Sequence, residues 1–378
     1  MGRIGTRRGR STPPDWGEPP WQVSLEPQAA PLPRRCQVAV IGAGLTGLTA
    51  AYALSRRGVD VVVFEADVVG SGASGRTGGI ILEDTAQGRL AAVEDCIPTL
   101  QRLLLETGIA CELDLPGCWE LTHESRGNPL WQDGDREISI EDTVPGGTLD
   151  PGKLVGDLAR AVRRAGVMLF EHAPVREISA GPTLRLQVAE KVVVAEHAVL
   201  GLNAYTRSLV APGADFHPAL ALALCTGPLE PGTIERIGIT DRTPFYTVDL
   251  PYLWGRPLCR NHEERLILGG GLGFDASGQV RRIDCASPEV VQSFAHLEER
   301  VRGLHPALAQ IAIAFRWGGP VAFRAGGHPI LCRHPAQPNL ILTGAYAGHG
   351  LSLSVRMGEL AARILLGDAD SPAWGVLD

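Results

Sequence analysis

A short run of apolar residues at 38–41 is the first regular pattern along the chain, after a start rich in proline and glycine. Such a run is typical of a strand that is buried on both faces. Apolar residues then recur with helical spacing from Leu45 to Arg57, and residues 61–64 form a second apolar run. The order strand, helix, strand predicts a βαβ unit and a parallel sheet.

The α/β pattern returns further along the chain, and its members are predicted from the same periods. They are a helix at about 152–165, strands at 167–171 and 198–202, a helix at 288–304, a strand at 340–343 and a helix at about 353–366. Residues 206–320 otherwise show short strand patterns. Residues 1–34 lack a hydrophobic period and predict an extended arm, which Trp16 and Trp21 hold against the body of the protein.

The composition argues against several classes of protein. The formal net charge of -7 and a pI of about 5.8 give no basic surface for nucleic acid. The 8 cysteines include no C-x-x-C pair, which speaks against a metal site or a disulfide framework. No apolar run approaches the roughly 18 residues that a membrane span needs. We therefore expect a cytoplasmic protein without a metal, membrane or nucleic-acid partner.

Three glycines stand between the first predicted strand and the first predicted helix. Gly42, Gly44 and Gly47 have the spacing G-x-G-x-x-G: the first allows a tight turn, the second a close approach of pyrophosphate, and the third close packing of helix on strand. The helix N-terminus would face the phosphates with its dipole and free N–H groups. Glu65 ends the second strand, where a carboxylate can accept hydrogen bonds from both ribose hydroxyls. These features predict a dinucleotide site.

The loop after Glu65 favours FAD over NAD. Residues 68–82, VVGSGASGRTGGIIL, are rich in glycine and serine and suit a loop that wraps a second diphosphate or a ribityl chain with backbone N–H groups. An NAD enzyme would normally continue with another βαβ unit. An NAD(P)-linked reductase would also need a second fingerprint. The other glycine cluster, LGGGLG at 268–273, lacks the context of strand, loop and helix.

Together these features resemble the D-amino-acid-oxidase superfamily of FAD-dependent amine oxidoreductases. The segment GASGRTGG at 72–79 is especially similar to the γ-glutamylputrescine oxidase branch, and the length and layout also fit glycine oxidase. Four further segments resemble the family in the same order, at 170–178, 200–209, 251–272 and 315–365. The G-D-A-A-H type motif of flavin aromatic hydroxylases is absent, and LTGAYAGHG stands in its place.

The resemblance implies an α/β (α+β) fold, in which a discontinuous, Rossmann-like FAD-binding domain carries an inserted mixed β-sheet domain over the flavin. The expected division is an N-terminal arm at 1–34, the FAD-binding domain at 35–90, 150–210 and 325–378, and the substrate-binding domain at 91–149 and 211–324.

It also implies which residues hold FAD. The expected cofactor-binding residues are Gly42, Gly44, Leu45, Thr46, Gly47, Glu65, Ala66, Ala73, Ser74, Gly75, Arg76, Thr77, Gly78, Gly79, Val175, Asn203, Gly348, His349, Gly350 and Leu351. Of these, Val175 would touch the adenine through its backbone, and residues 348–351 would lie at a helix start whose N–H groups stabilise reduced anionic flavin.

The implied chemistry is removal of a hydride from the carbon next to an amine nitrogen, with transfer to flavin N5. An apolar pocket favours the neutral amine that this step needs. The imine then hydrolyses, and O2 is expected to reoxidise the flavin and give H2O2. Tyr252, Trp254, Arg324 and His349 are the catalytic candidates; each has a structural alternative, in core packing or, for Arg324, in a salt bridge.

Departures from the family pattern bear on the cofactor and its acceptor. Gly319 or a neighbour stands where sarcosine oxidases link flavin to a cysteine, so the resemblance implies non-covalent FAD. Leu266 or Ile267 stands where those enzymes use a lysine to activate oxygen. Transfer of electrons to another acceptor therefore stays open.

Other departures bear on the substrate. Ser352 replaces the lysine that holds a carboxylate in sarcosine oxidases, and Val321 aligns with the carboxylate-binding arginine of glycine oxidase. Arg324 is the nearest alternative cation. Glycine and sarcosine are thus disfavoured, and a larger amine is expected: an N-carboxymethyl amino acid, which would give glyoxylate and a free amine, or an acylated polyamine such as γ-glutamylputrescine. A non-catalytic flavin-binding relative is the alternative from a different class.

Overall fold

The computed structural model describes the chain in six stretches, residues 3–4, 15–28, 30–124, 127–211, 213 and 215–377. Parts of the expected arm at 1–34 lie outside these residues. Within them, Trp16 and Trp21 are buried, as predicted. The Trp16 indole N–H donates to the carbonyl of Ile283 at 2.7 Å, and that of Trp21 to the carbonyl of Gly75 at 2.9 Å.

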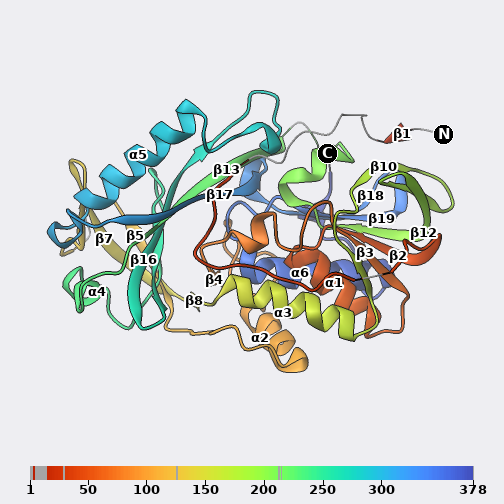
Figure 1. Ribbon diagram of the computed structural model, residues 1–378, viewed down its shortest axis with the longest axis horizontal. Helices are drawn as coiled ribbons and strands as arrows, with labels where there is room; N and C mark the ends of the chain where they lie inside the picture. Colours follow the sequence, from red (N-terminus) through yellow and green to blue (C-terminus); the bar gives the residue numbers. More distant parts are fainter. Residues whose placement is uncertain are drawn as a thin grey trace.

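Two large sheets lie side by side along the length of the molecule (Figure 1). In sheet order, the nine-stranded sheet contains β1 (Arg3–Ile4), β10 (Val175–Ser179), β11 (Leu184–Val188), β12 (Lys191–Leu200), β2 (Arg35–Ile41), β3 (Val61–Phe64) and β9 (Met168–Phe170), with β19 (Gln337–Gly344) paired to β12 and β18 (Ile330–His334) paired to β19. The pairs β12–β2, β2–β3, β3–β9 and β12–β19 are parallel.

The eight-stranded sheet is mixed. In order it contains β17 (Ile313–Phe323), β13 (His217–Thr226), β16 (Glu263–Gly273), β15 (Trp254–Arg260), β14 (Phe245–Thr247), β5 (Cys118–Thr122), β7 (Arg136–Val144) and β6 (Trp131–Asp133). A two-stranded sheet of β4 (Ile80–Leu82) and β8 (Gly146–Thr148) lies between the larger ones in Figure 1.

The helices cover the sheets unequally. They are α1 (Leu45–Ser55), α2 (Cys96–Thr107), α3 (Pro151–Arg164), α4 (Thr233–Arg236), α5 (Pro288–Gly303) and α6 (Gly350–Leu366), with 3-10 turns η1 (Ala73–Gly75), η2 (Asn203–Ser208), η3 (Val280–Arg282), η4 (Pro306–Leu308), η5 (Ala325–Gly327) and η6 (Ala373–Gly375). Figure 1 shows α1, α3 and α6 on one face of the nine-stranded sheet and α5 beside the eight-stranded sheet. The elements predicted from the periods are present, with small differences at their ends, except that the strand expected at 198–202 is the end of the longer β12, which begins at Lys191 and ends at Leu200.

Glycines allow the predicted βαβ unit to close tightly. A Cβ at Gly47 would lie 2.0 Å from the carbonyl oxygen of Gly42, so only glycine lets α1 start this close to the end of β2. A Cβ at Gly358 of α6 would lie 2.5 Å from the carbonyl oxygen of Thr46. The close packing of α1 on α6 brings the N-termini of both helices to the same region of the molecule.

The division into two domains remains a proposal. The strands of residues 35–90, 150–210 and 325–378 lie mostly in the nine-stranded sheet, whereas β13 to β17 lie in the eight-stranded one. Helix α2, which falls in 91–149, packs against α6 and shares its core cluster. Of the helices in the described stretches, none combines the length and apolar character needed to cross a membrane.

Candidate active site

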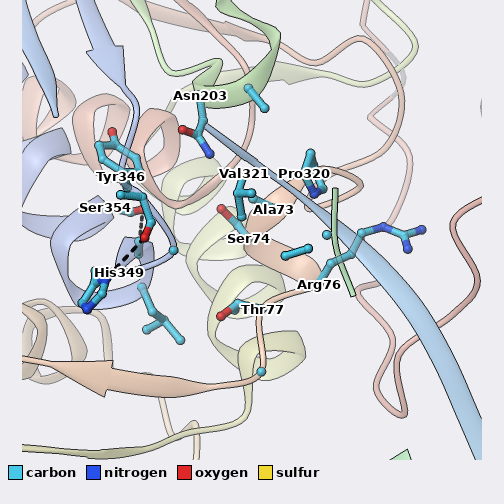
Figure 2. Close-up of a pocket in the computed structure, with 18 of the residues that line it drawn as sticks. Ala73, Ser74, Arg76, Thr77, Asn203, Pro320, Val321, Tyr346, His349 and Ser354 are labelled. Carbon is cyan, nitrogen blue, oxygen red and sulfur yellow. Dashed lines mark hydrogen bonds between the residues drawn. The ribbon is translucent and has the colours of Figure 1, made fainter. Parts of the chain in front are cut away.

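A cavity of about 1110 Å³ lies where the two large sheets meet. Its volume slightly exceeds the roughly 300–1,000 Å³ that is typical of small-molecule sites. The wall includes residues from both large sheets and from the α6 N-terminus (Figure 2). The predicted cofactor residues in this wall are Gly42, Gly44, Leu45, Thr46, Glu65, Ala66, Ala73, Ser74, Arg76, Thr77, Gly78, Val175, Asn203, Gly348, His349, Gly350 and Leu351.

Three predicted glycines do not line the cavity and act through packing. Gly47 lets α1 approach β2, as described above. A Cβ at Gly75 would lie 2.2 Å from the carbonyl oxygen of Gly70, and one at Gly79, where φ is +83°, would lie 2.5 Å from the carbonyl oxygen of Leu149. Gly47 thus shapes the start of α1, and Gly75 and Gly79 shape the loop, without lining the cavity.

The glycine-rich turn at the start of α1 is built to receive a phosphate. Gly42 has φ +100°, and a Cβ at Gly44 would lie 2.9 Å from the Ser74 hydroxyl oxygen. The N–H of Leu45 donates to the same hydroxyl at 2.9 Å, which joins the α1 N-terminus to the loop of η1. A helix N-terminus with free N–H groups and close backbone access suits a pyrophosphate.

Glu65 lies in the cavity wall directly after β3. Its carboxylate accepts hydrogen bonds from the N–H of Ala43 at 2.8 Å and from that of Asp67 at 3.0 Å. Burial raises the pKa of Glu65, and the two N–H groups oppose this rise. The carboxylate is thus held at the point where the fingerprint places a ribose.

Arg76 lines the cavity, but its guanidinium is bonded to backbone carbonyls. It donates to Ser71 at 3.1 Å, to Gly17 at 2.8 Å and to Gly318 at 3.2 Å. Figure 2 shows this side chain directed away from His349. Burial lowers the pKa of Arg76. These hydrogen bonds join the N-terminal segment and β17 to the glycine-rich loop at 68–82.

One row of side chains, which we name the roof row, crosses the eight-stranded sheet above the cavity. Read across paired positions, the roof row is Glu120 on β5, Tyr246 on β14, Trp254 on β15, Gly269 on β16, Ala223 on β13 and Trp317 on β17. All of these except Gly269 line the cavity. Paired residues on neighbouring strands lie on the same face of a sheet, so the roof row forms a continuous surface.

Trp254 occupies the middle of the roof row because two glycines make space for it. A Cβ at Gly78 would lie 2.2 Å from the indole, and one at Gly269 would lie 2.0 Å from it. Tyr252 lines the mouth of the cavity with 55% of its surface exposed. The structure therefore brings both predicted aromatic residues to the cavity.

His349 precedes the first turn of α6 and lies beside Tyr246. The two ring centroids are 5.9 Å apart with an interplanar angle of 84°. The His349 Nδ1 lies 3.3 Å from the carbonyl oxygen of Ala347. Burial lowers the pKa of His349, so its imidazole is neutral at neutral pH. The N–H groups of the α6 N-terminus lie at this end of the cavity.

Arg324 does not join the other candidates. It lies outside the cavity lining, and its Nε is 3.2 Å from an Asp215 carboxylate oxygen in a largely buried ion pair. The expected anchor for a substrate carboxylate is thus directed to a salt bridge, the structural alternative considered above. Leu266 and Ile267 are fully buried and also lie outside the lining.

Glu120 and Tyr246 are not among the residues predicted from the sequence. The Tyr246 hydroxyl donates to a Glu120 carboxylate oxygen at 2.5 Å, and both residues line the cavity near His349. A glutamate between the apolar residues of CWELT was a detectable signal, because alternate residues of a strand face opposite sides.

Among the described residues, no group of three or more histidine, cysteine, aspartate or glutamate side chains is arranged to hold a metal ion.

The residues present fit a dinucleotide cofactor. Gly42 and Gly44 line the cavity at positions where a Cβ would collide with Gly201 or Ser74, so the turn stays free of side chains. Glu65 offers a carboxylate for hydroxyl groups, and the same cavity extends to His349.

Comparison with known proteins agrees with this reading. A curated relative, "Probable oxidoreductase OrdL" of Rhizobium meliloti, is 27% identical over 88% of this chain and 84% of its own length. The γ-glutamylputrescine oxidoreductase of Escherichia coli is 25% identical over 89% of this chain and 84% of its own length.

The structure of glycine oxidase from Geobacillus kaustophilus has the same fold. It aligns with a TM-score of 0.67 at 20% identity and covers 92% of this chain and 97% of that one. The DAO family, described as FAD-dependent oxidoreductases, matches residues 37–364. The chain therefore belongs to the DAO family of FAD-dependent oxidoreductases.

Proposed function

We propose that the protein oxidises the CH–NH bond of a small primary or secondary amine, with FAD bound non-covalently. FAD, when bound, supplies a two-electron acceptor for the hydride that leaves the carbon next to nitrogen. The observation that carries the proposal is the continuity of one cavity from Gly42 and Glu65 to Tyr246, Trp254 and His349. A bound dinucleotide and a small substrate can meet only in such a joined space.

The roof row provides the surroundings that amine oxidation needs. Ala223 and Trp317 are buried, and Trp254 lies between them and Tyr246. This apolar end of the roof row, from Trp254 to Trp317, disfavours the charged ammonium and so favours the neutral amine, whose lone pair is needed to expel the hydride. The same aromatic surface excludes water from the reacting atoms.

The α6 N-terminus and His349 set the charge at one end of the cavity. Negative charge that develops at this end is stabilised by the N–H groups and dipole of α6. His349 adds no positive charge at neutral pH, because burial lowers its pKa. It is left to orient groups by hydrogen bonding.

Non-covalent binding of FAD is supported by the cavity lining. Gly319 lines the cavity, and it or a neighbour stands where the resemblance would place a flavin-linking cysteine. Within the described part of the chain, no cysteine lines the cavity. The cofactor should therefore be released by denaturation without proteolysis.

The cavity favours an amine without a carboxylate at the reacting carbon. The Ser352 hydroxyl donates to the carbonyl of Leu82 at 2.5 Å, Val321 is apolar, and Arg324 lies elsewhere. Of the substrate classes predicted from the sequence, the proposal is an acylated polyamine rather than an N-carboxymethyl amino acid. The imine hydrolyses to a carbonyl compound and an amine, and O2 takes up two electrons and two protons to give H2O2.

Turnover in air tests this proposal. Purified holoenzyme mixed with diamines and N-acylated diamines should form carbonyl product and H2O2 in equal amounts, whereas N-carboxymethyl amino acids should give no glyoxylate. A Gly44→Val variant, whose side chain would collide with Ser74, should lose FAD and serve as the inactive control. If carbonyl product formed only with an added electron-accepting dye and without H2O2, the electron acceptor would not be O2. No carbonyl product from any amine would contradict the function.

A further inference from the structure

Glu120 and Tyr246 form a carboxylate–phenol pair in the cavity wall near His349. They occupy paired positions on the parallel strands β5 and β14, so both side chains lie on the cavity face of the sheet. The Tyr246 hydroxyl donates to one carboxylate oxygen at 2.5 Å. Burial and the neighbouring carboxylate both raise the pKa of Tyr246, so the phenol stays protonated. The pair therefore presents an oriented carboxylate.

Half of this carboxylate is available to a ligand. Its second oxygen accepts no hydrogen bond from any residue in the described stretches, and Glu120 forms no ion pair with them. A half-buried carboxylate without a counter-ion is unfavourable, and it binds a cation more strongly than an exposed one does. Asp84 also lines this part of the cavity, and its charge contributes to the raised pKa of Tyr246.

The cations of the cavity wall are held in other places. Among the described residues, the arginines in the wall are Arg76, Arg281 and Arg300. Arg76 is bonded to backbone carbonyls, Arg281 lies 4.8 Å above the ring of Tyr205, and Arg300 pairs with Asp133 at 2.7 Å. No lysine of the described residues lies in this wall. The carboxylate–phenol pair is thus complementary to a positively charged group of a bound molecule.

We propose that Glu120, oriented by Tyr246, binds a second protonated nitrogen of the substrate, so that the substrate is a diamine, or an acylated polyamine that keeps a second basic nitrogen. This inference rests on the proposed amine oxidation and names its substrate class. Trp254 follows Tyr246 in the roof row. It therefore lies two strand spacings, or about 10 Å, from Glu120. The two aromatic rings between these positions offer an apolar surface for the methylene chain that joins the nitrogens.

Anaerobic flavin reduction by three amines of equal chain length tests the inference. The probes are butane-1,4-diamine, butan-1-amine and 4-aminobutanoate, mixed with wild-type holoenzyme. The diamine should reach half of its maximal reduction rate at a concentration about 10- to 100-fold below that of the monoamine, because a hydrogen bond to a charged group contributes that much to binding. The carboxylate at the end of 4-aminobutanoate should be repelled.

Variants separate recognition of the second nitrogen from other roles. Glu120→Gln should raise the half-saturating concentration of the diamine about 10-fold or more and leave that of the monoamine unchanged, with similar maximal rates. Tyr246→Phe should have a smaller effect in the same direction. Glu137→Gln, an exposed carboxylate on β7 outside the cavity, is the matched control and should behave as the wild type.

Two results would overturn the inference while amine oxidation still stands. In one, monoamine and diamine would give half of the maximal rate of flavin reduction in the wild type at the same concentration. In the other, Glu120→Gln would lower the maximal rates for both amines equally, which indicates a role in proton removal. If no amine reduced the flavin, the proposed function itself would fail, and the inference with it.

Discussion

Asp215 and Arg324 join the residues just before β13 to the end of β17. The Arg324 side chain is 7% exposed and that of Asp215 is 22% exposed, so the ion pair is largely shielded from water. A shielded pair that loses one partner leaves an uncompensated charge, which is more costly than losing an exposed pair. At the scale of single residues, Arg324 therefore supports the fold beside the cavity.

This role predicts the effect of Arg324→Met. Removal of the guanidinium should lower the free energy of unfolding by about 1–3 kcal/mol and leave the KM for the amine unchanged. Arg316→Met is the matched control, because Arg316 forms a more exposed pair with Glu298, and its loss should cost at most about 1 kcal/mol. Denaturant unfolding and steady-state kinetics check both. A raised KM with unchanged stability would contradict this role and would indicate that Arg324 binds the substrate.

At the scale of elements, the contact between α1 and α6 determines how the two helix N-termini meet the cavity. Gly358 lies against α1, and a Cβ there would be 2.5 Å from the Thr46 carbonyl oxygen and 2.8 Å from the Thr49 side chain. These neighbours are backbone and a β-branched side chain, which cannot easily move aside. The helices would have to separate.

We therefore expect Gly358→Ala to destabilise the protein by about 1–3 kcal/mol, as overpacking does. Because the shift moves both helix N-termini, FAD should also dissociate faster. Gly303→Ala at the end of α5 is the control: nothing lies within 4 Å of its added Cβ, and alanine should be neutral or stabilising there. Thermal unfolding and flavin fluorescence measure the two effects. Equal behaviour of the two variants would mean that the α1–α6 contact is not tight.

At the scale of the whole molecule, a buried charge network holds the mouth of the cavity. His123 on the segment after β5 bonds to Asp133 at 2.7 Å and to Asp249 at 2.5 Å, one with each ring nitrogen. Arg300 of α5 bonds to Asp133 and to the carbonyl of Tyr252. The network thus fixes the loop of Tyr252 to the eight-stranded sheet and α5.

This network predicts a pH dependence of stability. Burial alone would raise the pKa of Asp133, but hydrogen bonds from Arg300 and His123 lower it, and hydrogen bonds from His123 likewise lower the pKa of Asp249. A lowered pKa in the folded state stabilises the protein above the ordinary aspartate pKa, near pH 4, and this stability is lost as the pH falls through the lowered value.

Asp133→Asn should therefore lower the unfolding free energy by about 3 kcal/mol at pH 7 and reduce its pH dependence below about pH 4. Denaturant unfolding at pH 7 and below about pH 4 measures both effects. Asp142→Asn, which removes an exposed carboxylate on β7, should leave both values as in the wild type. An equal loss of unfolding free energy on acidification in Asp133→Asn and in the wild type would contradict the role of the network.

The local parts of this fold followed from the sequence, and the long-range parts did not. The periods around Leu45 and at 61–64 reflect burial of short segments, so they predicted α1 and β3, and Gly42 and Gly44 had meaning from spacing alone. Glu120 and Tyr246 are 126 positions apart and meet only through the pairing of β5 with β14. Pairings of this kind also place Arg324 on Asp215, and no local pattern encodes them.

Anaerobic mixing of the purified holoenzyme with an amine tests the central claim most directly, since it removes the acceptor from the question. The account predicts that the visible absorption band of the flavin bleaches with diamines or their acylated derivatives and that NADPH leaves it unchanged. A yellow protein that no amine bleaches, or one that NADPH bleaches, would contradict oxidation of a CH–NH bond as its reaction.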